Sequence, residues 1–282
     1  MESFDQSLKY LLAHEPAAFL GFALGGASVE VLQPVEAVLP SRGREIDGGH
    51  RVRVNGALCV AHVEFHRRHQ AQRELALDVA EAQVRLHRRE EVEVVSVVWD
   101  LYGDRTAPVL SACVLRYAAG SQSTYTRVNL RGMGWRALLA EGPPALWSLV
   151  PLTADGASEE GVHAAREAIT RRTDLSAAQR ADQLAVLWFV AEAEAVAVAV
   201  MRAYIRREDM MQSVLYQEIY GEGELKGELK GERRAVLDLC EVLDIPLTPE
   251  REALIQRLDL KQLADLRAHL KRERAWPETP RT

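Results

Sequence analysis

Two acidic residues, Asp47 and Glu64, have the types and the spacing that could hold a divalent metal ion. Sixteen residues separate them, and Asn55-Gly56 lies midway. This dipeptide between two β-rich runs is the strongest short-range signal for a two-residue type I′ hairpin. The hairpin register places Asp47 directly opposite Glu64, where their Cβ atoms would lie about 4.5–5.5 Å apart and the like charges would destabilise the ladder. A cation such as Mg²⁺, which prefers oxygen ligands, would offset that repulsion.

The same register gathers further titratable side chains on this face. Glu45 falls opposite His66, and His62 lies two residues before Glu64. Because side chains alternate between the faces of a strand, these residues form a cluster of three carboxylates and two imidazoles. The alternative is a solvated face whose charges pair with nearby arginines. A β-bulge between positions 47 and 64 would also break the pairing.

The hairpin needs flanking elements to bury its other face. That face is mostly apolar and should pack against helices; it holds Ile46, His50, Val52, Val54, Ala57, Cys59, Ala61, Val63 and Phe65. Helical periodicity predicts helices over 3–24 and 70–89, on either side of the hairpin strands 45–54 and 57–66. A short strand is expected within 28–39, and further strands over 109–117 and 124–130. The β-branched run 92–101 is almost continuously apolar, which is typical of a central strand.

The second half of the chain changes character and is predicted to be all helical. The expected helices cover 158–171, 176–208, 210–241, 249–258 and 260–273. We therefore divide the chain into an α/β domain (1–135), a helical extension (136–209) and a helical tail (210–282). Gly223, Gly227 and Gly231 recur every four residues in the tail. This repeat favours either close helix–helix approach in a homo-oligomer or a charged connector helix that packs poorly.

Composition bounds the classes of protein that the chain can belong to. The 282 residues carry a net charge of −6, with 48% hydrophobic and 27% charged residues, which excludes wholesale disorder and a fibrous protein. Three dispersed cysteines favour a reducing compartment. No signal peptide is expected. Glu192 and Glu194 interrupt the most apolar stretch, 184–201, so we expect a cytoplasmic protein without a membrane partner.

The segment around the two acids is locally basic. Between Arg42 and Arg89, arginines outnumber acidic residues, and His-Arg-Arg-His follows Phe65 directly. Such a segment suits a polyanionic substrate held against a metal site. The alternative is an ordinary charged helix surface.

With these residues in view, the chain resembles a known nuclease superfamily. Asp47 followed by Glu64-x-His66 is similar to the D…E-x-K signature of the PD-(D/E)XK nucleases. The opening segment 4–12 (Phe-Asp-Gln-Ser-Leu-Lys-Tyr-Leu-Leu), residues 44–47 (Arg-Glu-Ile-Asp) and residues 62–66 (His-Val-Glu-Phe-His) resemble the Rpn family of recombination-promoting nucleases, also described as transposases. Asp5 and Lys9 match that family's recurring acid and lysine. The resemblance covers residues 1–150 and, more loosely, the tail.

The resemblance implies a fold, a reaction and roles for individual residues. The fold would be a restriction-endonuclease-like α-β-β-β-α-β core of the mixed α/β class, followed by an all-helical region. The reaction would be hydrolysis of DNA phosphodiester bonds, with Asp47 and Glu64 binding one or two Mg²⁺ or Mn²⁺ ions. His66 stands where the family has lysine or glutamine. That departure leaves open a module that binds DNA or protein without turnover, or a helical interaction protein that assembles through its tail.

Overall fold

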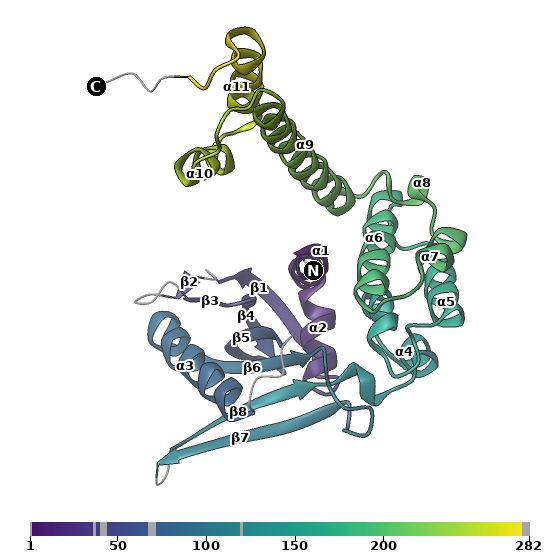
Figure 1. The fold of residues 1–282 in the computed structure, drawn as a ribbon. Coiled ribbons are helices and arrows are strands. Elements are labelled where there is room, and N and C mark those ends of the chain that lie inside the picture. The colour runs from purple at the N-terminus through teal and green to yellow at the C-terminus, as the bar shows by residue number, and fades with distance from the viewer. Residues whose placement is uncertain (1, 36–37, 40–43, 67–71, 119–120, 278–282) are drawn as a thin grey trace. The chain divides into compact units, whose positions relative to one another are not determined.

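A computed structural model describes residues 2–35, 38–39, 44–66, 72–118 and 121–277 of the chain. It contains a mixed α/β part followed by a helical C-terminal region, as the sequence predicts. The chain divides into two compact units, Met1–Tyr216 and Gln217–Thr282. Figure 1 shows the elements of each unit.

The first unit is built on a six-stranded mixed sheet with the strand order β1-β4-β5-β6-β8-β7. The neighbours β5, β6 and β8 run parallel, whereas β1–β4, β4–β5 and β7–β8 are antiparallel. The predicted central strand is confirmed as β6, which lies between β5 and β8. The strands are β1 (Val29–Pro34), β4 (Gly48–Val54), β5 (Ala57–His66), β6 (Glu93–Asp100), β7 (Leu110–Ala118) and β8 (Ser121–Val128).

The hairpin between β4 and β5 has the predicted turn and register. Asn55 and Gly56 both have positive φ, 49° and 86°, as a type I′ turn requires. Val54 pairs with Ala57, and the ladder continues without a shift to Gly48 and Val63. The prediction made from the Asn-Gly dipeptide is therefore confirmed over seven residue pairs.

The ladder ends before it reaches the predicted acidic pair. Asp47 lies in a bend between β4 and the two-residue strand β3 (Arg44–Glu45). The expected pairing of Glu45 with His66 is wrong, because Glu45 pairs with Val38 in β2 (Val38–Leu39). Because the strand is broken at this bend, Ile46 also lies on the opposite face of the sheet from the one predicted.

Helices cover both faces of the sheet (Figure 1). On one face, Phe19 contacts Phe65 and Trp99. It belongs to α2 (Pro16–Ala23), which follows α1 (Glu2–His14). The other face packs against α3 (Gln72–Glu90), where Val60 and Ile46 contact Leu86. Ile46 therefore lies opposite the face predicted for it.

The predicted helix over 3–24 is two helices, because Pro16 begins a new one. A proline in a helix interior removes a backbone donor and clashes with the preceding turn, so it is tolerated at a first helical position. The predicted helix over 176–208 is likewise interrupted. α6 (Ala177–Ala193) begins with a Ser176 capping box and ends before Ala195, whose φ is 58°; α7 (Val198–Tyr204) and α8 (Arg207–Met210) follow.

Among the remaining helices of the first unit, α6 packs beside α1. Tyr10 on α1 donates a hydrogen bond of 2.6 Å to Asp182 on α6, a contact between segments 172 residues apart. Arg131 forms an ion pair of 2.6 Å with Glu194 at the end of α6. The other elements of this group are η1 (Leu130–Gly132), α4 (Trp135–Glu141), η2 (Pro144–Leu152) and α5 (Glu159–Thr170).

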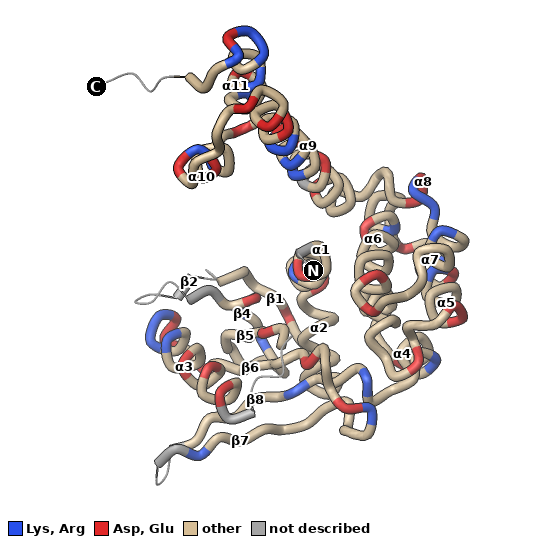
Figure 2. The backbone as a smooth tube through the Cα atoms, viewed as in Figure 1, with Lys and Arg blue, Asp and Glu red and all other residues tan. Residues whose placement is uncertain are grey.

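The second unit has a small core of its own. Val236 and Cys240 of α9 (Val214–Val242) pack with Ile255 of α10 (Pro249–Arg257) and Leu263 of α11 (Leu260–Glu273). Acidic and basic residues alternate along α9 (Figure 2). In the part of the chain that the structure describes, no helix combines the length and apolar character needed to cross a membrane.

Candidate metal-binding site

The bend after β3 brings Asp47 to the strand that carries Glu64. Asp47 Oδ2 accepts a hydrogen bond of 2.8 Å from the backbone N–H of Phe65, the residue after Glu64. The two predicted acids are therefore neighbours, although Asp47 is not a ladder partner of Glu64. The bend leaves Oδ1 of Asp47 to face Lys9 on α1, whose Nζ lies 3.3 Å away.

The surroundings of Asp47 oppose its negative charge. Burial raises the pKa of Asp47, and the nearby charge of Glu64 raises it further. The Phe65 N–H and the Lys9 ammonium act in the opposite direction, but they do not fully compensate. A partly buried carboxylate beside a second carboxylate is stabilised by any additional cation, so this pair has the electrostatic character of a cation site.

A buried histidine holds Glu64 in place. His62 is fully buried on β5, with Nε2 3.0 Å from Glu64 Oε1 and Nδ1 3.0 Å from Ser96 Oγ on β6. A ring held at both nitrogens fixes the carboxylate next to it, as outer residues do in metal sites. His62 was predicted to lie on this face but was given no role. The signal was available in the spacing of two between His62 and Glu64.

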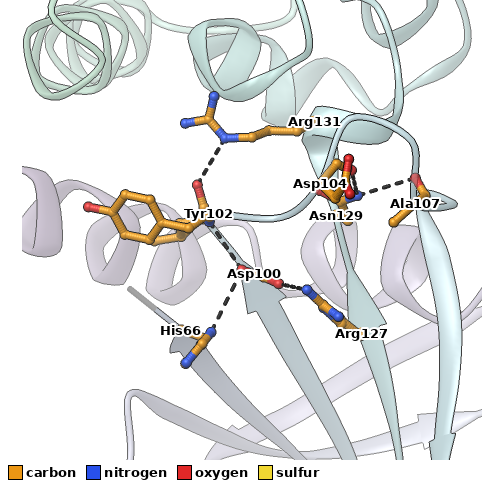
Figure 3. Close-up of polar contacts among 9 residues, drawn as sticks. His66, Asp100, Tyr102, Asp104, Ala107, Arg127, Asn129 and Arg131 are labelled. Atoms are coloured by element: carbon orange, nitrogen blue, oxygen red, sulfur yellow. Dashed lines mark hydrogen bonds and ion pairs between the residues drawn. The ribbon is translucent and has the colours of Figure 1, made fainter. Parts of the chain in front are cut away.

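His66, the third residue of the predicted motif, lies in a second polar cluster (Figure 3). Its Nδ1 is 3.7 Å from Asp100 Oδ1, beyond hydrogen-bond distance. Asp100, at the end of β6, forms an ion pair with Arg127 of β8 and accepts a hydrogen bond of 3.1 Å from the Tyr102 N–H. Among the described residues, neither ring nitrogen of His66 has a hydrogen-bond partner.

The second cluster favours an ionised Asp100. Burial opposes the charge, but His66, Arg127 and the Tyr102 N–H outweigh it and lower the pKa of Asp100. The loop after β6 is braced alongside, because Asn129 donates to the Asp104 carbonyl at 2.7 Å (Figure 3). The cluster lies at the carboxyl ends of the parallel strands β5, β6 and β8.

Lys9 was not predicted to belong to the site. Asp5 and Lys9 match a family pattern, but nothing in that pattern showed which strand α1 would approach. In the structure, α1 packs closely on β4, since a Cβ atom at Gly48 would lie 2.3 Å from Leu12 Cδ2. The bare backbone of Gly48 thus permits the approach that sets Lys9 against Asp47.

The residues present fit a magnesium site with few protein ligands. Across the described ranges, no group of three or more His, Cys, Asp and Glu side chains could hold a metal ion. Mg²⁺, however, keeps several waters and is usually bound through one or two carboxylates together with substrate phosphates. Asp47 and Glu64 meet that smaller requirement.

Three arginines of the locally basic segment are paired with acids. Arg51 forms an ion pair of 2.9 Å with Glu90, Arg85 pairs with Glu81, and Arg53 lies 3.4 Å from Glu30. The basic run 67–69 that follows His66 lies outside the described residues. The three acids are not those of the predicted cluster, in which Asp47 has Lys9 as its cationic neighbour.

Comparison of the chain with protein-family models, with curated proteins and with solved structures gives no match. The function is therefore inferred from the residues and from their geometry.

Proposed function

We propose that the protein is a metal-dependent endonuclease that hydrolyses DNA phosphodiester bonds. The observation that carries the proposal is the meeting of Asp47 and Glu64 at one end of β5, with Asp47 held by the Phe65 N–H. Burial and the repulsion from Glu64 raise the pKa of Asp47, so a cation bound at this place would stabilise its ionised form.

The metal would be Mg²⁺ or Mn²⁺, held by Asp47 and Glu64. Bound there, such an ion supplies an activated water and positive charge beside the phosphate. The chain's own residues provide the rest of the site. Asp47 presents Oδ1, because Oδ2 is occupied by the Phe65 N–H, and His62 fixes the Glu64 carboxylate from its buried position.

DNA as the substrate is supported by the resemblance and by the order of elements. With the two-residue strands β2 and β3 set aside, the order α1–α2, β1, β4, β5, α3, β6 is compatible with the α-β-β-β-α-β arrangement that the resemblance implies. A phosphodiester also matches the preference of Mg²⁺ for carboxylates and phosphate oxygens together. Arg67 and Arg68, which follow His66 in the sequence, would add positive charge for the DNA backbone.

A second candidate is a nuclease-like module that binds DNA or protein without cleaving it. The position of His66 favours this candidate, because the ring lies near Asp100, which is itself paired with Arg127 in the second cluster. On this hypothesis the residue in the lysine position of the motif contributes no charge to the reaction, and binding alone would remain.

Plasmid nicking in Mg²⁺, Mn²⁺ and EDTA separates the two candidates. The test compares the wild type with Glu64→Gln, which keeps the shape of the side chain and removes its charge. Glu30→Gln is the matched control, since Glu30 is an exposed residue of the same sheet paired with Arg53. We expect metal-dependent nicking by the wild type and the control, and none by Glu64→Gln.

Two results would contradict the nuclease assignment. One is cleavage by Glu64→Gln with unchanged metal dependence. The other is an intact plasmid with every metal, accompanied by a gel shift that weakens steeply with salt; this result would favour the binding module.

A further inference from the structure

Lys9 contacts the oxygen of Asp47 that a metal ion would need. Its Nζ lies 3.3 Å from Asp47 Oδ1 and 3.5 Å from Asp5 Oδ2. The other oxygen of Asp47, Oδ2, already accepts the Phe65 N–H. A lysine and a metal ion would therefore compete for Oδ1, because it is the one carboxylate oxygen without a backbone donor.

We propose that Lys9 is a resident counter-ion of Asp47 that a divalent cation displaces, and that the released ammonium then contacts a phosphate of the substrate. The inference rests on the proposed function for its second half. Its first half, the exchange of one cation for another at Asp47, requires that a divalent cation binds there but not that DNA is cleaved.

The position of Lys9 suits both the metal-free state, in which it pairs with Asp47, and the metal-bound state, in which it is released. Its side chain is 39% exposed, so the ammonium can leave Asp47 without entering a buried environment. Asp5 lies one turn earlier on α1 and keeps the ammonium near the site after Oδ1 is taken. Lysine is a compact, mobile point charge with three donors, which suits contact with a phosphate oxygen.

This assignment gives a positive charge to a site whose motif lacks one. His66 replaces the lysine of the resembled signature and lies against Asp100. Lys9 comes from a helix 38 residues before Asp47 but reaches the same carboxylate. A positive charge beside the attacked phosphate stabilises the charge that develops in the transition state.

The exchange predicts opposite effects on metal binding and on cleavage. Lys9→Met removes the competing charge, so Mn²⁺ should bind on the order of tenfold more tightly, as expected for a unit charge a few ångströms from the ion. Nicking should nevertheless fall, because the phosphate loses its contact with the ammonium. A lysine with a merely structural role would weaken both when it is lost.

Calorimetric titration with Mn²⁺ and plasmid nicking are measured on the same preparations. Arg53→Met is the control, because it removes one positive charge from the same sheet at an exposed pair. It should change neither the affinity nor the nicking. Lys9→Arg should restore the wild-type affinity. Asp5→Asn should weaken Mn²⁺ binding, since Lys9 then keeps Asp47 as its acidic partner; this variant tests the exchange if Lys9→Met does not fold.

The outcomes separate the cation exchange at Asp47 from the nuclease activity and from the contact of Lys9 with the phosphate. Equal or weaker Mn²⁺ binding by Lys9→Met would overturn the exchange, as would a wild type that binds no Mn²⁺. Tighter binding by Lys9→Met with a wild type that cleaves nothing would support the exchange and reject the nuclease. Tighter binding with undiminished nicking would remove Lys9 from contact with the phosphate.

Discussion

The close packing of α1 on β4 makes a quantitative prediction at Gly48. Gly48→Ala would place a Cβ atom 2.3 Å from Leu12 Cδ2, whereas two carbons attract at about 3.5–4.0 Å. Leu12 is 2% exposed, so its side chain has little room to move aside. Overpacking of this kind costs about 1–3 kcal/mol, and we expect that loss in the free energy of unfolding.

A double-mutant cycle shows whether the cost comes from this contact. Leu12→Ala alone should destabilise the unit by about 2–5 kcal/mol, because it leaves a cavity. In the double variant the added Cβ atom no longer meets Leu12, so the loss should be close to that of Leu12→Ala alone. The coupling between the two substitutions should therefore be about 1–3 kcal/mol in the stabilising direction.

Urea unfolding followed by tryptophan fluorescence measures these changes. Four of the five tryptophans lie in the first unit, and Trp99 contacts Phe19 in its core. The midpoint should shift at a constant slope, which marks a change in stability and not in the surface exposed on unfolding. Two results would refute the reasoning: a Gly48→Ala variant within about 0.5 kcal/mol of the wild type, or substitutions that add within that margin.

Substitutions at three further positions test other parts of the structure. Asp100→Asn should lower the free energy of unfolding by about 1–3 kcal/mol at pH 7, because it leaves Arg127 without its carboxylate. Folding lowers the pKa of Asp100, so the difference should begin to shrink below about pH 4 and should be lost as the pH falls through the lowered pKa of the folded state. A gap that persists unchanged in acid urea titrations would contradict this assignment. Asn55→Ala should cost about 1 kcal/mol at positive φ, whereas Asn55→Gly should cost less, as urea midpoints would show. Gly227→Ala should stabilise α9 by about 0.8–1 kcal/mol in thermal circular dichroism, because nothing lies within 4 Å of the added Cβ atom; a loss of stability that depends on protein concentration would indicate instead that this face packs against a second copy.

Local signals in the sequence were sufficient for most of the elements. The Asn55-Gly56 dipeptide predicts both the turn and the register, because few residues adopt positive φ and a two-residue loop leaves no freedom in pairing. The strand over 57–66 and the helices over 249–258 and 260–273 lie within about a residue of the observed elements. Periodicity and capping involve residues only a few positions apart, so both can be recognised directly in the sequence.

The ends of the hairpin were less predictable. Alternation along the strand predicts that Glu45 lies opposite His66 and that Ile46 lies with the apolar face. Both predictions are wrong, because the ladder stops at Gly48 and β3 pairs with β2. The residue at which a ladder ends depends on competing strand partners and on the space left by α1 and α3. Neither can be read from the positions of residues along one strand.

The sequence by itself determined the mixed α/β start, the helical second half, the hairpin register and the acidic pair Asp47 and Glu64. Only the tertiary structure decided which residues surround that pair. It buries His62 against Glu64, turns His66 to Asp100, and brings Lys9 to Asp47 across 38 residues of chain. Such contacts depend on how closely whole elements pack, and a glycine at position 48 sets that distance for α1.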